Sequence, residues 1–150
     1  MAITRVESRE RNRGMVEFER GRRPRVILVD DDRDAAEMYR FGLEQMGFDV
    51  SVEGDGAGLF VALESHIPDI VVLDWDLPGE RGDAVLWRLR GNRSYALVPV
   101  IFLSNFPAQL DGHVDRAFEA GALAWLEKTK TPPPLLSVKL AEALRARSAA

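Results

Sequence analysis

Short apolar runs alternate with longer stretches of helical character along most of the chain. The runs begin near residues 25, 48, 70, 98 and 124 and are mostly apolar or β-branched, which is typical of strands covered on both faces. Each interval between two runs is long enough for one crossover helix and its loops. The pattern predicts strands at 25–29, 48–52, 70–73, 98–103 and 124–126.

Helix start and stop signals fall in the intervening stretches. The acidic residue Asp32 begins the first stretch, and Gly47 follows its last residue. Both residues are typical of helix ends at these positions. Gly121 ends the fourth stretch, and Pro134 lies in the first turn of the fifth, where proline is tolerated. The predicted helices are 32–46, 55–65, 82–90, 108–120 and 134–147.

Five strands that alternate with five helices imply an α/β fold: a five-stranded parallel sheet with helices on both faces. The run at 48–52 is the most polar, which suits a less covered position in the sheet. Ligand sites in such sheets lie beyond the carboxyl ends of the strands, at the switch in strand order. The residues that end each run are therefore the candidate functional residues.

Composition places the chain among ordinary globular proteins. Its 150 residues are about one domain's worth of chain, and 46% are hydrophobic and 29% charged, which is usual for soluble proteins. The lack of cysteine excludes a disulfide framework, a thiolate metal site and a cysteine nucleophile. The longest apolar stretch, 96–103, is far shorter than the roughly 20 residues that cross a bilayer. With no apolar signal region at the N-terminus, we expect a cytoplasmic protein that does not contact the membrane.

Charged residues are distributed unevenly along the chain. Residues 1–24 contain seven Arg and four Glu, whereas the whole chain has a net charge of −4. This basic arm has few apolar residues and no sustained periodicity, so we expect it to be flexible and residues 25–148 to form the folded domain. The arm is either a solvated tail or a contact for nucleic acid or an acidic partner. Its interleaved Glu residues and the acidic body disfavour nucleic acid.

Side chains of complementary chemistry follow four of the predicted strands. Asp30 and Asp31 follow the first, Asp74 the third, Ser104 the fourth and Lys128 the fifth, and these ends converge at one rim of a parallel sheet. Clustered carboxylates repel one another, and a hard divalent cation such as Mg²⁺ offsets the repulsion. The ammonium and the hydroxyl suit phosphate oxygens, and one carboxylate suits a nucleophile that forms an acyl phosphate.

Four segments together resemble the receiver domain of two-component response regulators. Each is weakly specific alone, but they occur in the family's order and spacing, and the similarity covers about residues 25–148. The resemblance implies a flavodoxin-like (βα)5 receiver fold and a phosphoacceptor signalling domain that is not an enzyme beyond its own phosphorylation and dephosphorylation. The segments are Val29–Asp31, Leu73–Gly79, Phe102–Ser104, and Gly121–Ala122 leading to Lys128.

The resemblance also implies the binding roles at the site. Asp74 would be the phosphoacceptor. Asp30, Asp31, Asp74 and the backbone carbonyl of Asp76 would hold Mg²⁺. Lys128 would contact the phosphoryl group and pair with Asp74 beforehand.

Further roles follow from the same resemblance. Ser104 would contact the phosphoryl group and form the switch with Trp125, which turns inward as Ser104 moves. Asn105 and Asp76 depart from the commoner family residues, so we expect them to modulate access of the phosphodonor and of water. Thr129 stands where the family usually has a proline after a cis peptide, and we expect a trans peptide or a rearranged loop there.

The expected function is that of a single-domain response regulator. It would take a phosphoryl group from a histidine kinase or a phosphotransfer protein and signal by binding an unidentified downstream protein. In such receivers the changed surface is the face built by residues 108–120, 124–126 and 134–147, through which a homodimer is also considered.

Two alternatives stay open at this point. Asp74-Trp75-Asp76 is similar to the Asp-x-Asp motif of haloacid-dehalogenase-like phosphatases, although Pro78 departs from that motif. The second alternative is a receiver whose arm binds nucleic acid. Outside the site, we expect Trp75 to shield the rim without chemistry and His66 and His113 to face solvent.

Overall fold

The computed structural model describes residues 21–107 and 112–149, so the arm up to residue 20 and the predicted helix start at residue 108 lie outside the described residues. Five strands form one parallel sheet in the order β2-β1-β3-β6-β7. This is the predicted α/β architecture, and the polar second strand lies at an edge as expected. The strands are β1 (Arg25–Val29), β2 (Asp49–Glu53), β3 (Ile70–Leu73), β6 (Val100–Ser104) and β7 (Ala124–Glu127).

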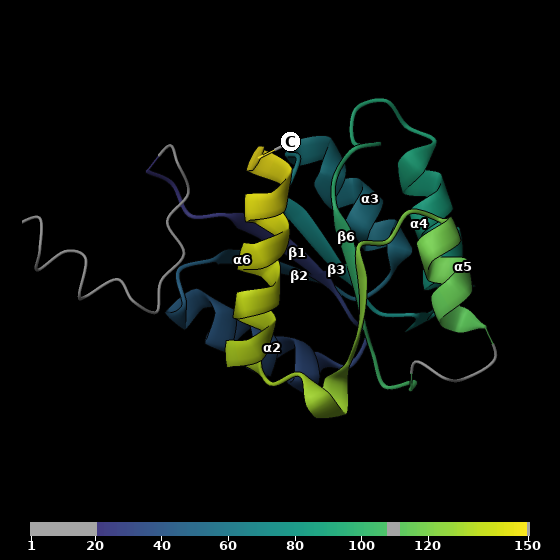
Figure 1. Cartoon of the computed structure of the whole chain (residues 1–150). Helices are drawn as coiled ribbons and strands as arrows, with labels where there is room; N and C mark the ends of the chain where they lie inside the picture. The colour runs from purple at the N-terminus through teal and green to yellow at the C-terminus, as the bar shows by residue number, and fades with distance from the viewer. Residues whose placement is uncertain (1–20, 108–111, 150) are drawn as a thin grey trace, which may run out of the picture.

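Helices cover both faces of this sheet (Figure 1). On one face α2 and α6 pack over a core that includes Tyr39, Leu43 and Leu140. On the other face α3, α4 and α5 pack over a second core that includes Trp75 and Phe102. The helices are α2 (Arg33–Gln45), α3 (Gly56–Ser65), α4 (Gly82–Arg90), α5 (His113–Glu119) and α6 (Pro133–Ala149).

The apolar runs form strands because each side chain has a covered face to occupy. All four residues of β3 and all five of β6 are buried, as the continuous apolar pattern predicts. The fourth strand begins at Val100 rather than at residue 98. Pro99 lacks a backbone donor, but its carbonyl still accepts from Val71 N at 2.9 Å.

Side-chain caps start the first two helices as the sequence indicates. The Asp32 carboxylate accepts a hydrogen bond from Ala35 N at 3.2 Å, and the Asp55 carboxylate accepts one from Gly58 N at 2.7 Å. Both satisfy backbone donors that have no partner inside the helix. None of the described helices has the length and apolar character needed to cross a membrane.

Two small elements were not predicted. β4 (Asp76–Leu77) and β5 (Glu80–Arg81) form a short antiparallel hairpin just after Asp74. Gly79 lies in its turn with a φ of 82°. A short 3-10 helix, η1 (Lys128–Lys130), follows β7. Both elements lie at the carboxyl ends of strands and therefore shape the rim where ligands bind in such sheets.

Candidate functional site

Three carboxylates meet at the carboxyl ends of β1 and β3. Asp30, Asp31 and Asp74 each offer one oxygen, and these oxygens lie within 4.8 Å of one another. The strands bring them together because Val29 and Leu73 are register partners in neighbouring parallel strands. The structure thus assembles the acidic cluster that the sequence predicts, with Asp30 and Asp74 buried and Asp31 exposed.

Backbone hydrogen bonds fix the two buried acids. Asp74 N donates to Val29 O at 3.0 Å, and Asp30 N donates to Glu53 O at 2.9 Å. Asp30 Oδ1 also accepts a hydrogen bond from Asp32 N at 3.0 Å. The main chain is thus anchored on both strands, so the carboxylates are held close together despite their mutual repulsion.

Lys128 provides the positive charge of the cluster. Its Nζ lies 2.7 Å from Asp30 Oδ2 and 3.3 Å from Asp74 Oδ2, and its side chain is only 9% exposed. Pairing with Asp74 is as expected, while the shorter contact with Asp30 was not anticipated. One ammonium therefore bridges the acids that end two different strands.

Burial sets the protonation behaviour of Asp74. Removal from water, together with the charge of Asp30, raises the pKa of Asp74 from 3.8 to about 6, against the opposing effects of Lys128 and of the Asp76 backbone N–H. Burial lowers the pKa of Lys128, but its contacts with Asp30 and Asp74 outweigh this, and the net shift is upward. A further cation near this carboxylate would favour its ionised form.

The acidic cluster fits a hard divalent cation. Carboxylate and carbonyl oxygens are the ligands that Mg²⁺ prefers, and it commonly uses one or two carboxylates together with phosphate oxygens. Asp30, Asp31 and Asp74 supply such oxygens within reach of one another. The Asp76 backbone N–H donates to Asp74, and the Asp76 side chain points to solvent from the first residue of β4.

Ser104 and Asn105 follow one another at the end of β6 but differ in burial. Ser104 is completely buried, and its Oγ accepts a hydrogen bond from Phe106 N at 3.1 Å. Asn105 is exposed. The hydroxyl thus already has a backbone partner, whereas the Asn105 side chain is exposed to solvent.

An aromatic cluster lies behind this end of β6. The Trp75 ring is 5.2 Å from Trp125 and 5.4 Å from Phe102 between centroids. Trp125 is half-buried, and its Nε1 donates to Phe106 O at 3.2 Å. The inferred switch residue Trp125 therefore connects, through Phe106, to the segment that begins at Ser104.

The expectation that His113 faces solvent is wrong. Its ring stacks on Trp75 with centroids 4.9 Å apart and an interplanar angle of 27°. Its Nδ1 is buried without a hydrogen-bond partner among the described residues. His113 opens α5, so Trp75, which directly follows Asp74 in the chain, packs against the start of that helix. The other histidine, His66, is half-buried at the end of α3.

The peptide bond after Lys128 is trans, one of the two forms that the sequence suggests. Among the described residues no peptide bond is cis, and Lys128, Thr129 and Lys130 form the 3-10 turn η1. The Tyr39 hydroxyl donates to Thr131 O at 2.8 Å. Sequence reasoning missed Tyr39 because it occupies the buried stripe of α2 with Ala36 and Leu43, where an aromatic residue signals only packing.

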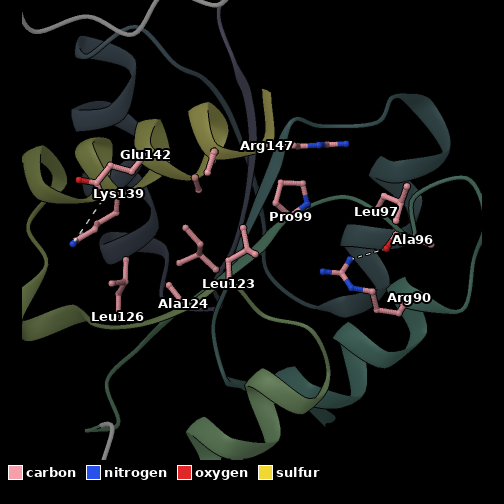
Figure 2. A pocket seen from close by; sticks show the side chains of 13 residues that line it. Arg90, Ala96, Leu97, Pro99, Leu123, Ala124, Leu126, Lys139, Glu142 and Arg147 are labelled. Atoms are coloured by element: carbon pink, nitrogen blue, oxygen red, sulfur yellow. Dashed lines mark hydrogen bonds and ion pairs between the residues drawn. The ribbon is translucent and has the colours of Figure 1, made fainter. Parts of the chain in front are cut away.

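A separate groove of about 840 Å³ lies away from the carboxylates. Figure 2 shows it beside β7 and α6, with Ala124 and Leu126 on β7 and Lys139 and Glu142 on α6. Leu97, at another part of the lining, is 85% exposed. The groove is therefore largely apolar and lies on the β7 edge of the sheet, remote from the phosphoacceptor candidate.

Comparisons with known proteins agree with this geometry. A family model described as response regulator receiver domain matches residues 26–138. Proteins named DNA-binding response regulator MtrA, from Mycobacterium tuberculosis and Mycolicibacterium paratuberculosis, are 36% identical to the chain over 115 residues. The match covers 77% of this chain but only 48% and 49% of those proteins, so the chain spans about half the length of the curated relatives it matches.

Solved structures share the fold over most of the chain. A CheY-like receiver domain protein from Methanospirillum hungatei superposes with a TM-score of 0.75 at 21% identity, covering 84% of this chain and 97% of that one. A two-component response regulator of the LuxR family from Aurantimonas gives a TM-score of 0.72 at 28% identity, with coverages of 83% and 86%. The similarity therefore covers most of this chain and shows that it shares the fold of these proteins.

Proposed function

This chain belongs to the response regulator receiver domain family, a phosphoacceptor signalling module rather than an enzyme, and we propose that Asp74 accepts its phosphoryl group. A receiver domain implies a histidine kinase as partner, and a phosphotransfer protein is the alternative donor. One observation carries the proposal: the Asp74 carboxylate lies among Asp30 and Asp31 and 3.3 Å from the Lys128 ammonium. The cluster thus combines a nucleophile with groups that neutralise phosphoryl charge.

In the proposed step, a carboxylate oxygen of Asp74 attacks the phosphorus atom of a phosphohistidine. An O–P bond forms while the P–N bond breaks, and the imidazole leaves with the electron pair and takes up a proton. The Lys128 ammonium pairs with a phosphoryl oxygen, and the Ser104 hydroxyl, whose oxygen accepts from Phe106 N in the present state, donates its hydrogen to another. Positioning and charge neutralisation account for most catalysis of phosphoryl transfer.

The acidic cluster also supports a Mg²⁺ requirement. Asp30, Asp31, Asp74 and the backbone carbonyl of Asp76 are the proposed ligands. When bound, Mg²⁺ supplies positive charge that offsets the carboxylates and the phosphoryl oxygens. Asp30 and Asp31 hold that charge next to Asp74, where burial otherwise disfavours the ionised, nucleophilic form.

We propose that the signal leaves through α5, β7 and α6. Ser104 and Trp125 form the switch, linked in the present state through Phe106. Exposed apolar residues lie on α5 (Phe118), on α6 (Val138) and directly before β7 (Leu123), and they suit a protein contact. The partner is a downstream protein, and a second copy of the chain on the same surface is the alternative.

The remaining expectations concern a phosphatase activity, the arm, the domain boundary and the location of the protein. The phosphatase alternative is not supported, because the family is a phosphoacceptor module rather than an enzyme. A nucleic-acid contact by the arm at 1–24 stays a prediction, because residues 1–20 of the arm lie outside the described residues. The division into an arm at 1–24 and a domain at 25–148 stays a prediction, as does a cytoplasmic location.

Phosphorylation with acetyl phosphate and Mg²⁺ tests the proposal. Intact-protein mass spectrometry is expected to show one added phosphoryl group in the wild type, and none after chelation of Mg²⁺ or in Asp74→Asn. Asp76→Asn is the matched control, because Asp76 is an exposed carboxylate only two residues away, and it should still be modified. Modification of Asp74→Asn to the wild-type extent would disprove the assignment of Asp74.

A further inference from the structure

One continuous segment of the chain carries both Tyr39 and the acids Asp30 and Asp31, which are proposed to bind Mg²⁺. β1 ends at Val29, Asp30 and Asp31 follow it, and the Asp32 cap leads directly into α2. Tyr39 lies two turns into this helix, is 1% exposed, and points toward the loop after β7 (its hydroxyl bonds there). The segment that places two carboxylates of the site therefore also places this phenol.

The Tyr39 hydroxyl contacts both ends of the turn that begins with Lys128. It donates to Thr131 O at 2.8 Å and lies 3.4 Å from Lys128 O. The Thr131 backbone N–H in turn donates to Lys128 O at 3.3 Å, which closes the turn. The short contact with Thr131 is the stronger bond, and it is buried. The hydroxyl thus fixes the main chain at the point where the Lys128 side chain departs.

A second contact holds the same loop against α2. Gly42, one turn after Tyr39, has no side chain, and a Cβ at its position would overlap Pro133 Cβ. Pro133 is the first residue of α6. The loop from Lys128 to Pro133 is therefore attached to α2 by one hydrogen bond and by one close approach that only glycine permits.

We propose that Tyr39 is a positioning residue that holds Lys128 in place for phosphoryl transfer to Asp74, which rests on the proposed function above. The residue after Lys128 is Thr129, so no proline ring stiffens the turn. The hydroxyl ties the lysine to the segment that carries Asp30 and Asp31, and the ammonium reaches Asp30 and Asp74 from there at 2.7 and 3.3 Å. Loss of the bond frees the turn and lengthens the average distance of the ammonium from the phosphoryl oxygens.

A double-mutant cycle tests whether Tyr39 acts through Lys128. The variants are Tyr39→Phe, Lys128→Met and the pair, and the measured quantity is the rate constant for phosphorylation of Asp74 by acetyl phosphate at saturating Mg²⁺. Tyr39→Phe is expected to lower the rate about three- to tenfold, the effect of one hydrogen bond, in the wild-type background. In the Lys128→Met background the same change is expected to have no effect, because the group it positions is gone.

Two further variants separate positioning from general loosening. Tyr95→Phe is the matched control, because Tyr95 is half-buried next to Phe60 on the other side of the sheet, and it should leave the rate unchanged. Gly42→Ala displaces the loop without touching Tyr39, and it is expected to lower the rate only when Lys128 is present. Far-UV circular dichroism checks that each variant is folded at the assay temperature.

The outcomes distinguish this inference from the proposed function. Equal losses from Tyr39→Phe with and without Lys128, or no loss at all, would overturn the positioning role while Asp74 remains the phosphoacceptor. Failure of the wild type to be phosphorylated on Asp74 would overturn the proposed function and the role of Tyr39 with it. A loss confined to the background that contains Lys128, and repeated by Gly42→Ala, supports the proposal.

Discussion

Lys128 Nζ lies 2.7 Å from Asp30 Oδ2, and the side chains of Lys128 and Asp30 are only 9% and 1% exposed. The ammonium thus offsets the charge of an acid that is also a proposed Mg²⁺ ligand. The same nitrogen is farther, at 3.3 Å, from the Asp74 carboxylate that it is expected to assist. The lysine and a divalent cation therefore compete for the negative charge of this cluster.

Lys128→Met is accordingly expected to tighten Mg²⁺ binding while it slows phosphorylation. Loss of one nearby positive charge leaves the carboxylates more attractive to Mg²⁺, by on the order of 1 kcal/mol or about fivefold in Kd. Titration followed by intrinsic tryptophan fluorescence measures this, since Trp75 adjoins Asp74. Lys130→Met, at a neighbouring exposed lysine, should leave the affinity unchanged. Weaker Mg²⁺ binding in Lys128→Met would contradict the competition.

The raised pKa of Asp74 predicts a pH-dependent stability. The pKa is about 6 in the folded state and 3.8 ordinarily, so the folded protein binds the proton more tightly than the unfolded chain. Protonation of Asp74 therefore contributes fully to the free energy of unfolding below about pH 4. This contribution is lost as the pH rises through about 6 and is absent above that.

Replacement of the charge should reverse this loss. Asp74→Asn is expected to raise the free energy of unfolding at about pH 7.5 by on the order of 2 kcal/mol over the wild type, and the difference should shrink toward about pH 4. Urea unfolding across this range, with a chelator present, measures both. Added Mg²⁺ should reduce the difference, because it stabilises the ionised wild type. A difference independent of pH would mean that burial does not disfavour the Asp74 charge.

Trp125 donates to Phe106 O at 3.2 Å, and its proposed switch role predicts that its fluorescence responds to phosphorylation. We expect tryptophan fluorescence to change when Mg²⁺ and acetyl phosphate are added, and Trp125→Phe to lose much of that change while its phosphorylation rate stays within about twofold of wild type. Trp87→Phe is the control, because Trp87 is 58% exposed on α4. An undiminished response in Trp125→Phe would exclude Trp125 from the switch.

Asn105 offers a test of access to the site. Its side chain is exposed directly after the buried Ser104, so Asn105→Ala should open the approach to Asp74 without a change in stability beyond about 0.5 kcal/mol. We expect faster phosphorylation by acetyl phosphate and faster loss of the phosphoryl group, each by about two- to fivefold. Rates measured by mass spectrometry over time provide the check, and unchanged rates for both reactions would show that Asn105 does not limit access.

The sequence predicted the sheet and the rim because both depend on strong local signals. Runs such as Ile70–Leu73 are apolar throughout and are covered on both faces, and parallel strands place their carboxyl ends together. Asp30, Asp74 and Lys128 therefore converge as their positions after the strands require. Helix caps such as Asp32 follow equally local rules.

The missed features depend on tertiary contacts that carry no local pattern. The strands of the β4–β5 hairpin are two residues long, too short for any alternation to be read. His113 lies on a helix with no local sign of burial, and the rings that cover it, Trp75 and Phe106, come from other segments of the chain. Likewise the buried face of α2 predicts that Tyr39 packs in the core. The hydrogen-bond partner of the Tyr39 hydroxyl is the backbone carbonyl of Thr131, which is distant in sequence.

The close approach of α4 to the Asp74 main chain gives the last prediction. A Cβ at Gly82 would lie 2.7 Å from Asp74 O and would overlap the Phe102 ring, and Gly82 N already donates to Trp75 O at 2.6 Å. Gly82→Ala is therefore expected to cost about 2–3 kcal/mol of stability, as overpacking does, and to slow phosphorylation because Asp74 is displaced. Gly54→Ala is the matched control, since its Cβ would meet no atom within 4 Å, and its stability should stay within about 1 kcal/mol of wild type. Urea unfolding and the acetyl phosphate assay measure both effects, and equal behaviour of the two variants would contradict the close packing of α4 against the main chain at Asp74.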